Sequence, residues 1–332
     1  MAIELNDLLN LQPNKVNTNL ASKTMLIYGG YKAGKTSFCA KSLPDALLCA
    51  FEKGYNAIPD IKVIDINKWT EFKRIVKLLE APEMKNMYKT IIVDTIDLAA
   101  GLCEQYICQQ HGINALKDIP YGQGFGEYEK ELASTFRKIT MLGYGLAFTA
   151  QKDVKTAKNN KGEDIEVLQP LGDKRTLKVV NALVDFILYI GQEWDENGVE
   201  HRYFYSRNTP FITAGSRFGG MADKFPFTYD ALISEIDKAI KSDTKGDLSL
   251  VTNEEIVYAP ESKRLFSETM KEAGEVWAKF PKTPEWNEKK MAIVTEYFGQ
   301  PIKLSTATPE QQDLVESVIE DLKQLLPQIK TN

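Results

Sequence analysis

From about residue 22 onward, short apolar runs alternate with longer segments of helical periodicity. The runs have the length of buried strands, and the segments between them repeat apolar residues every three or four positions. Strands that alternate with helices predict a mainly parallel sheet covered by helices, which is an α/β fold. We expect strands at 25–28, 46–51, 62–66, 90–94, 145–150 and 183–190, and helices near 34–43, 68–80, 96–110 and 127–142.

A β-hairpin is predicted next. Apolar residues 186–190 and the alternating segment 201–206 flank Asn197-Gly198, a dipeptide suited to the positive φ angles of a tight turn. A short strand near 210–213 is expected to lead into the glycine-rich segment AGSRFGG.

Beyond AGSRFGG, a helix near 228–241 closes the predicted domain, and the polar stretch 241–249 marks a boundary. We therefore expect an N-terminal arm at 1–21, a core at 22–241 and a helical C-terminal domain at 250–332.

The last helix of the chain has a complete start signal. Thr308 is the expected N-cap, Pro309 occupies the first turn, and Gln311 completes a capping box. An apolar face follows, which predicts packing within a small helical bundle; a partner-binding groove or an oligomer contact is the alternative. The face consists of Leu314, Val315, Val318, Ile319, Leu322, Leu325 and Leu326.

Residues 29–36 read GGYKAGKT and match the phosphate-loop pattern G-x-x-x-x-G-K-[ST]. Glycines let the backbone wrap around a phosphate, and the N-terminus of the following helix favours anions. Lys35 is expected to reach the β- and γ-phosphates of ATP, and the Thr36 hydroxyl to ligate Mg²⁺. The predicted nucleotide contacts are Gly29, Gly30, Tyr31, Lys32, Ala33, Gly34, Lys35, Thr36 and Ser37.

The segment IIVDTID at 91–97 resembles a Walker B strand. Apolar positions end in Asp94, which places a carboxylate at the carboxyl end of a strand. We expect Asp94 to be the second protein group beside the metal.

Composition narrows the class of protein. The 332 residues are 43% hydrophobic and 26% charged, as in ordinary globular proteins. No segment has the features of a signal peptide, and no uncharged run approaches the roughly 20 residues that span a bilayer. The four cysteines form no C-x-x-C pair and there are two histidines, so buried thiols are expected rather than a zinc site. We expect a cytoplasmic protein with no membrane partner.

Further residues resemble the catalytic machinery of the RecA family. In those ATPases the glutamate that activates the attacking water follows the second strand, where this chain has Glu52. Gln151 resembles the glutamine that senses the γ-phosphate. The resemblance also implies a basic residue supplied by a neighbouring subunit. Arg217 is the first choice, with Arg207, Arg175 and Lys174 as alternatives.

The combination of GGYKAGKT, Glu52, IIVDTID, TAQKD and AGSRFGG resembles the core-only RecA-like ATPases of bacteriophages, the Sak-type proteins of single-strand annealing and recombination. The resemblance covers about residues 22–240. It implies a homo-oligomeric ATPase, ring or filament, that acts on single-stranded DNA in a host cytoplasm, with a single-strand-binding protein as a further partner. Two alternatives remain: a RecA-fold helicase or helicase loader, and a P-loop switch or scaffold acting on protein partners.

Two segments are candidates for contact with a single strand. The net charge of −5 does not itself favour nucleic acid, so a local basic groove is required. The segment 118–128 is expected to be flexible and to offer Tyr121 and Phe125 for base stacking. The segment 151–164 is expected to be a mobile loop whose lysines track phosphates; a solvated surface loop is the alternative. These lysines are Lys152, Lys155, Lys158 and Lys161.

Overall fold

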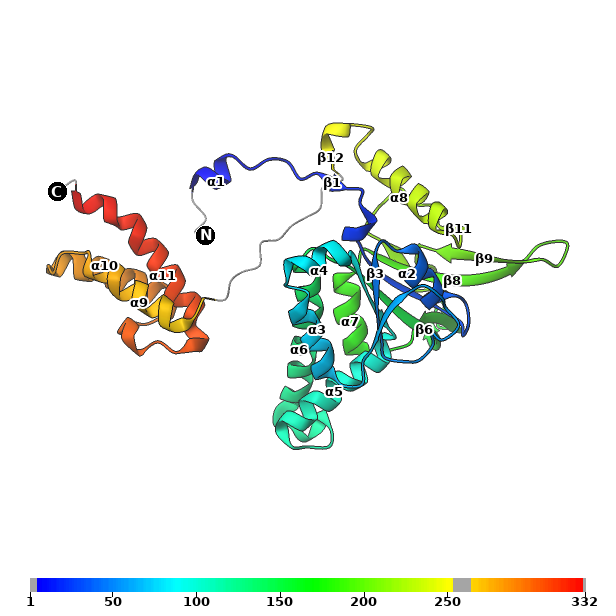
Figure 1. The fold of residues 1–332 in the computed structure, drawn as a ribbon, viewed down its shortest axis with the longest axis horizontal. Coiled ribbons are helices and arrows are strands. Elements are labelled where there is room, and N and C mark those ends of the chain that lie inside the picture. The colour runs from blue at the N-terminus through cyan, green and yellow to red at the C-terminus, as the bar shows by residue number, and fades with distance from the viewer. Residues whose placement is uncertain (1–4, 253–263, 331–332) are drawn as a thin grey trace. The chain divides into compact units, whose positions relative to one another are not determined.

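The computed structural model describes residues 5–252 and 264–330 of the chain. Backbone contacts divide the chain into two compact units, one formed by Pro13–Pro260 and the other by Met1–Gln12 together with Glu261–Asn332 (Figure 1). Within the described residues, no helix is long and apolar enough to cross a membrane.

The larger unit is built around a ten-stranded sheet with the order β11-β9-β8-β2-β6-β5-β3-β4, to which β10 adds through β8 and β7 through β6. The pairings that run from β8 through β2, β6, β5 and β3 to β4 are parallel. The predicted mainly parallel α/β fold is therefore confirmed. The strands are β2 (Thr24–Gly29), β3 (Ala46–Ala50), β4 (Lys62–Asp65), β5 (Thr90–Asp94), β6 (Gly145–Lys158), β7 (Asp164–Pro170), β8 (Phe186–Trp194), β9 (Glu200–Tyr205), β10 (Gly215–Ser216) and β11 (Lys224–Pro226).

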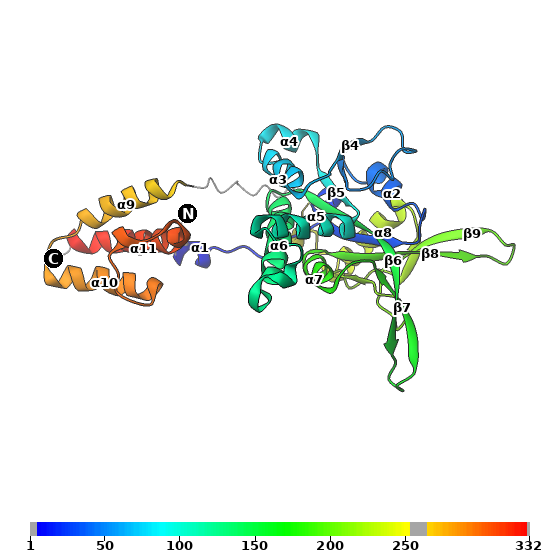
Figure 2. The same cartoon turned by 90° about the horizontal axis from the view of Figure 1, so that it is seen from below.

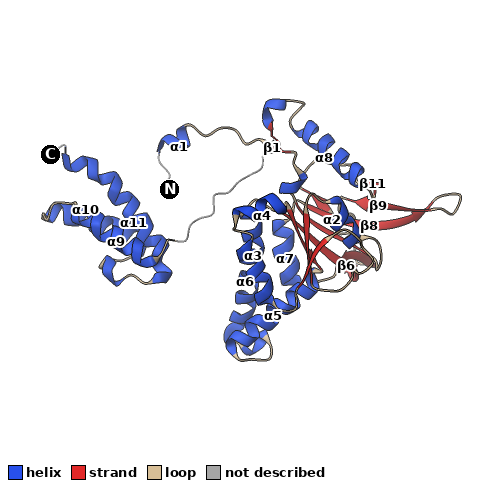
Figure 3. Ribbon diagram, in the orientation of Figure 1, coloured by secondary structure: helices blue, strands red, loops and turns tan. Residues whose placement is uncertain are grey.

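Helices cover both faces of this sheet (Figure 3). Along β2, Leu26 and Tyr28 join one buried apolar cluster, and Met25 and Ile27 join the other, because successive strand side chains point to opposite faces. The first cluster includes residues of α3, α5, α6 and α7, and the second includes residues of α2 and α8. The helices are α2 (Lys35–Ser42), α3 (Trp69–Leu78), α4 (Pro82–Met87), α5 (Ile96–His111), α6 (Gln123–Met141), α7 (Lys174–Leu183) and α8 (Tyr229–Asp243).

The predicted hairpin is also present. Strands β8 and β9 pair in antiparallel fashion, and Gly198 has a φ of 76° in the turn. Two expectations near it are wrong. Leu183 ends α7, a helix that the sequence analysis missed, instead of beginning a strand. Residues 210–213 form no strand, since Ile212 makes only an isolated bridge to Leu168.

The segment after residue 150 differs most from expectation. Strand β6 continues to Lys158 and pairs with β7 over seven residue pairs, from Lys152–Pro170 to Lys158–Asp164. This β6–β7 hairpin projects from the body of the unit (Figure 2). The prediction of a mobile loop at 151–164 is therefore wrong, because cross-strand hydrogen bonds order both arms of the segment.

The ends of the larger unit pair with each other. Val16–Asn17 (β1) lies parallel to Val251–Thr252 (β12), and the Thr18 N–H donates to the Thr252 carbonyl at 2.9 Å. Residues 16 and 17, assigned above to an arm, thus belong to the larger unit.

The smaller unit is helical. Its core consists of residues from α9, α10 and α11. On α11, Val315, Val318, Ile319 and Leu322 are buried, so the packing predicted for the last apolar face is confirmed. The Thr308 capping box is present, since the Thr308 N–H donates to Gln311 Oε1 at 3.0 Å. It caps the 3-10 turn Pro309–Gln311, however, and α11 itself begins at Gln312. The helices of this unit are α1 (Leu5–Leu9), α9 (Phe266–Ala278), α10 (Pro284–Phe298) and α11 (Gln312–Leu325).

Candidate active site

The phosphate loop joins the end of β2 at Gly29 to the start of α2 at Lys35. Gly34 is the N-cap of α2 and has a φ of 98°, a conformation that glycine adopts without strain. A Cβ at Gly34 would also lie 3.2 Å from the Phe227 ring. The loop thus leads directly into a helix N-terminus, whose free N–H groups form an anion-binding site.

Lys35, the first residue of α2, is buried, with a 5% exposed surface. Its Nζ donates to the Gly29 carbonyl at 3.2 Å, the Gly30 carbonyl at 2.9 Å and Gln151 Oε1 at 2.8 Å. An ammonium group has three donors, so all of them are used. Burial lowers the pKa of Lys35, while Asp94 and Glu52 act in the opposite direction.

Thr36 and Asp94 meet beside the lysine, as the two sequence motifs predict. Thr36 Oγ1 lies 3.2 Å from Asp94 Oδ1 and 3.0 Å from Asp94 Oδ2. Asp94 ends β5, which is separated from β2 by β6, and Thr149 of β6 also donates to Asp94 Oδ1. Burial raises the pKa of Asp94, and the two hydroxyl donors oppose that rise. A hydroxyl and a carboxylate are hard oxygen ligands, and this pair fits Mg²⁺.

Two more carboxylates surround this pair. Glu52 is half-buried just beyond β3, the strand next to β5. Burial raises the pKa of Glu52, and the negative charges of Asp94 and Asp97 raise it further. Asp97 lies in the first turn of α5, and among the described residues nothing donates a hydrogen bond to its buried Oδ1. An acceptor left in that state fits a hydrated cation nearby.

Asp97 was missed by the sequence analysis. The sequence did contain a signal for it, because a second acidic residue follows Asp94 three positions later in IIVDTID. The pattern did not distinguish that residue from an ordinary acidic group in the first turn of a helix.

Gln151 connects the loop lysine to the β6–β7 hairpin. It is paired with Gly29 in the parallel ladder between β2 and β6, so its side chain reaches Lys35. The backbone carbonyl of Gln151 accepts a hydrogen bond at 2.7 Å from the N–H of Leu171, the residue just beyond β7. The same residue therefore contacts the phosphate loop and anchors the base of the hairpin.

Arg202 is the second residue that the sequence analysis missed. It lies on β9, and its Nη1 donates to the Ala33 carbonyl at 3.4 Å, while its Nε pairs with Glu200 at 3.2 Å. No local motif marks it, because 169 positions of sequence separate it from Ala33. Only the ladder that places β9 beside β8 brings it to the phosphate loop.

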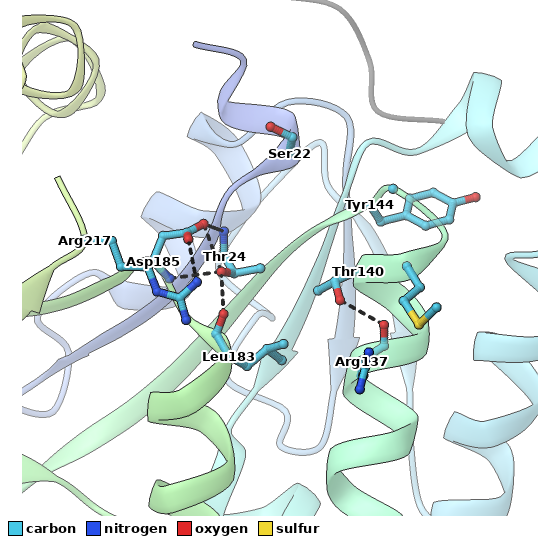
Figure 4. A pocket seen from close by; sticks show the side chains of 10 residues that line it. Ser22, Thr24, Arg137, Thr140, Tyr144, Leu183, Asp185 and Arg217 are labelled. Atoms are coloured by element: carbon cyan, nitrogen blue, oxygen red, sulfur yellow. Dashed lines mark hydrogen bonds and ion pairs between the residues drawn. The ribbon is translucent and has the colours of Figure 1, made fainter. Parts of the chain in front are cut away.

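Arg217 is far from the phosphate loop of its own chain. It donates through Nη2 to the Ala182 carbonyl at 2.7 Å and through Nη1 to Asp185 at 3.3 Å. Asp185 in turn accepts from the N–H of Thr24, the first residue of β2, at 3.0 Å (Figure 4). The phosphate loop follows the opposite end of the same strand, so a catalytic role for Arg217 requires a neighbouring subunit and stays a prediction.

Two of the three alternatives to Arg217 also have local partners. Arg207 pairs with Asp223 at 2.6 Å, and Arg175 pairs with Glu129 at 3.3 Å. Lys174 begins α7. None of these contacts brings a basic group to the phosphate loop of the same chain.

The segment 118–128 was expected to be flexible, but it consists almost entirely of 3-10 turns and the start of α6. Tyr121 is 99% exposed, as a stacking platform requires. Phe125 instead lies inside α6, where it packs against the core, and the Arg175 guanidinium covers its ring at 4.1 Å. The expectation of an open ring at Phe125 is wrong, because α6 begins at Gln123 and turns this side chain inward.

The hairpin lysines do not share one face. Successive side chains of a strand point to opposite faces. On β6, Lys152 and Lys158 therefore point to one face and Lys155 points to the other. Lys158 also pairs with Asp164 at 2.9 Å, and Lys161 lies in the turn. Over 152–170 the four lysines are balanced by Asp153, Glu163, Asp164 and Glu166.

Comparison with known proteins agrees with this geometry. A family model described as an AAA domain matches residues 21–218. The chain belongs to this family. It is also 30% identical, over 334 residues, to the SPbeta prophage-derived uncharacterized protein YorG of Bacillus subtilis (strain 168), with 96% of this chain and 98% of that protein covered. The protein is thus a nucleotide-binding ATPase of the P-loop class with a relative of prophage origin.

Proposed function

We propose that this AAA-domain protein is a Mg²⁺-dependent ATPase that acts on single-stranded DNA in phage-type recombination or annealing, as Sak-type proteins do. The observation that carries the proposal is the contact between Lys35 and Gln151, at 2.8 Å. Gln151 begins the arm of β6 that projects as a hairpin. Single-stranded DNA bound to the hairpin can therefore influence the nucleotide site through this one residue. The prophage origin of the relative supports the same class of process.

The residues around the phosphate loop have distinct roles in this proposal. Lys35 and the N–H groups at the start of α2 bind the phosphates. Thr36 and Asp94 hold Mg²⁺, which supplies charge neutralisation to the phosphate oxygens. Glu52 accepts a proton from the attacking water. A raised pKa makes Glu52 a stronger base, and burial together with Asp94 and Asp97 raises it.

We also propose that the active assembly is a homo-oligomer. Over residues 5–252 and 264–330, Arg202 is the arginine that contacts the phosphate loop of its own chain, and its partner there is a backbone carbonyl. Arg217 lies at the other end of β2. A basic group from a neighbouring copy is the remaining source of charge for the transition state. A single-strand-binding protein is a further proposed partner.

The test is steady-state ATP hydrolysis by the full chain, alone and with single-stranded DNA, duplex DNA or RNA. We expect single-stranded DNA to stimulate hydrolysis more than the other two. A rate indifferent to all three would refute the DNA-directed function and leave a switch that acts on protein partners. A Lys35→Ala variant, which lacks the loop ammonium, shows how much of the measured rate belongs to this site.

A second experiment tests whether the hairpin contacts DNA. Lys152 and Lys155 lie on opposite faces of β6, so each is neutralised in a separate variant. For single strands the slope of log K against log salt changes by about 0.7 per phosphate contact, so we expect a reduction of about 0.7 in the variant whose lysine faces the strand. The control is Lys158→Ala, because Lys158 already pairs with Asp164. An unchanged slope in both variants removes the hairpin from the interface.

A further inference from the structure

A cavity of about 490 Å³ lies in the larger unit, at the amino ends of the strands. Its lining includes Thr24, the first residue of β2, and Asp185, which immediately precedes β8. The phosphate loop lies beyond the carboxyl end of β2, so the two sites are at opposite edges of the sheet. Cavities of about 300–1,000 Å³ are typical of small-molecule sites, and apart from Arg217, the candidate residue for a neighbouring subunit, the lining of this one has no role in the function proposed above.

Two arginines line this cavity from different elements. Arg137 belongs to the last turns of α6, and Arg217 follows β10. Figure 4 shows them on different walls, with Arg217 beside Asp185 and Arg137 beside Thr140. The cavity therefore presents guanidinium groups from two sides.

The charges of the lining do not cancel. Asp185 is the carboxylate in the lining, and it is already engaged by Arg217 at 3.3 Å and by the Thr24 N–H and hydroxyl at 3.0 Å each. Arg137 is exposed and has no carboxylate or other side-chain partner among the described residues. A net positive cavity on a chain with a net charge of −5 favours an anion.

The donors that remain for a ligand are the N–H groups of Arg137 and those of Arg217 that do not already donate to Asp185 and the Ala182 carbonyl. The hydroxyl of Thr140 donates to the Arg137 carbonyl at 2.8 Å, and that of Ser22 donates to the Asn19 carbonyl at 2.8 Å. Guanidinium groups bind phosphate oxygens through two parallel hydrogen bonds. A phosphate is therefore the anion that this set of donors fits best.

Another part of the lining is apolar. Met141, which is 44% exposed, and Leu183 line the cavity, whereas Tyr144 is buried, with its hydroxyl on the Leu79 carbonyl and its ring beneath Lys85. A bare phosphate would leave this part of the cavity without contacts. A phosphate attached to a flat or apolar organic group uses both parts.

We propose that this cavity binds a phosphate ester of about nucleotide size, with Arg137 and the remaining N–H groups of Arg217 on the phosphate and the wall of Met141 and Leu183 against the organic group. The ester belongs either to a free mononucleotide or to one unit of a nucleic-acid strand. These sources share the chemistry that the cavity recognises, and they differ in what is attached to the phosphate.

The test is calorimetric titration of the full chain carrying Lys35→Ala, so that the phosphate loop contributes little. Thymidine 5′-monophosphate and a short oligothymidylate are titrated separately. We expect Arg137→Ala to weaken binding of at least one of them tenfold or more, and Arg137→Lys to restore part of the loss because it keeps the charge. The matched control is Arg74→Ala, which removes an exposed arginine of α3 and leaves the affinity unchanged.

The outcomes separate the two sources of the ester. Binding of the monophosphate that depends on Arg137 indicates a free ligand, and Arg137-dependent binding of the oligonucleotide alone indicates a strand. No binding of either probe, or binding that Arg137→Ala leaves unchanged, overturns the proposal. Basal ATP hydrolysis is measured on Arg137→Ala with Lys35 intact, where we expect the wild-type rate, so failure of this proposal is distinct from failure of the proposed function.

Discussion

Replacing Gln151 by alanine removes one of the three acceptors that hold the Lys35 ammonium group. The other two are the Gly29 and Gly30 carbonyls, which are fixed parts of the loop backbone. A bound phosphate must replace at least one of the three acceptors, and the Gln151 amide is the one that belongs to a side chain instead of the loop backbone. We therefore expect Gln151→Ala to strengthen the binding of ADP, because the lysine is released from a competing partner.

The magnitude follows from the type of bond. A hydrogen bond to a charged group contributes about 1.5–3 kcal/mol. The Lys35–Gln151 bond is short, at 2.8 Å, but only part-buried, so the lower end applies. Since about 1.4 kcal/mol corresponds to a factor of ten, the Kd for ADP should fall about tenfold. ADP is the appropriate ligand because it lacks the γ-phosphate that Gln151 is expected to sense.

The assay is equilibrium titration with ADP, and two variants accompany it. Gln151→Glu places a carboxylate beside the ammonium and near the phosphates, so the Kd should rise. Gln169→Ala is the matched control, since Gln169 lies on the same hairpin and donates to Asp153 at 3.1 Å instead of contacting Lys35. Unchanged or weaker ADP binding by Gln151→Ala would refute the reasoning, because the glutamine would then not compete with the phosphates for the lysine.

Three further predictions concern the residues around the loop. Glu52→Gln should retain nucleotide and slow hydrolysis by about 10²–10⁴-fold, the usual contribution of a general base; a wild-type single-turnover rate would assign the base elsewhere. Asp97→Asn should lower the pKa of Glu52, because Asp97 is one of the negative charges that raise it. Carboxyl ¹³C shifts of the nucleotide-free protein measure that pKa, and a rise or no change would contradict the electrostatic argument. If Arg217 acts across subunits, a mixture of the Arg217→Ala and Glu52→Gln variants should hydrolyse ATP faster than either variant alone. A mixture without this gain would show that Arg217 does not act in the neighbouring active site.

Much of the active site could be predicted from the sequence because its chemistry depends on local backbone geometry. The spacing of GGYKAGKT requires a strand, a tight glycine turn and a helix start, and β2 and α2 provide them around Gly34. Asp94 was predicted for the same reason, since an apolar run that ends in a carboxylate is a local pattern. The contact of Thr36 with Asp94 then follows once their strands share a sheet.

Local patterns misjudged the segments whose structure depends on a distant partner. Residues 151–158 are polar and rich in lysine, but pairing with β7 satisfies their backbone groups and makes them a strand. Phe125 is in a glycine-rich stretch, yet Gly124 fits against the Leu116 carbonyl, where a Cβ would lie 2.6 Å away, and α6 continues through it. In both places tertiary contacts override local propensity.

The sequence by itself determined which residues form the phosphate loop and that an α/β sheet carries it, because spacing and periodicity are local properties of the chain. Only the tertiary structure decided what surrounds the loop. The order of the sheet inserts β6 between β2 and β5, which brings Gln151 to Lys35, and the antiparallel addition of β9 brings Arg202 to Ala33. These contacts arise from strand pairing across more than 100 positions of sequence, and no local pattern encodes them.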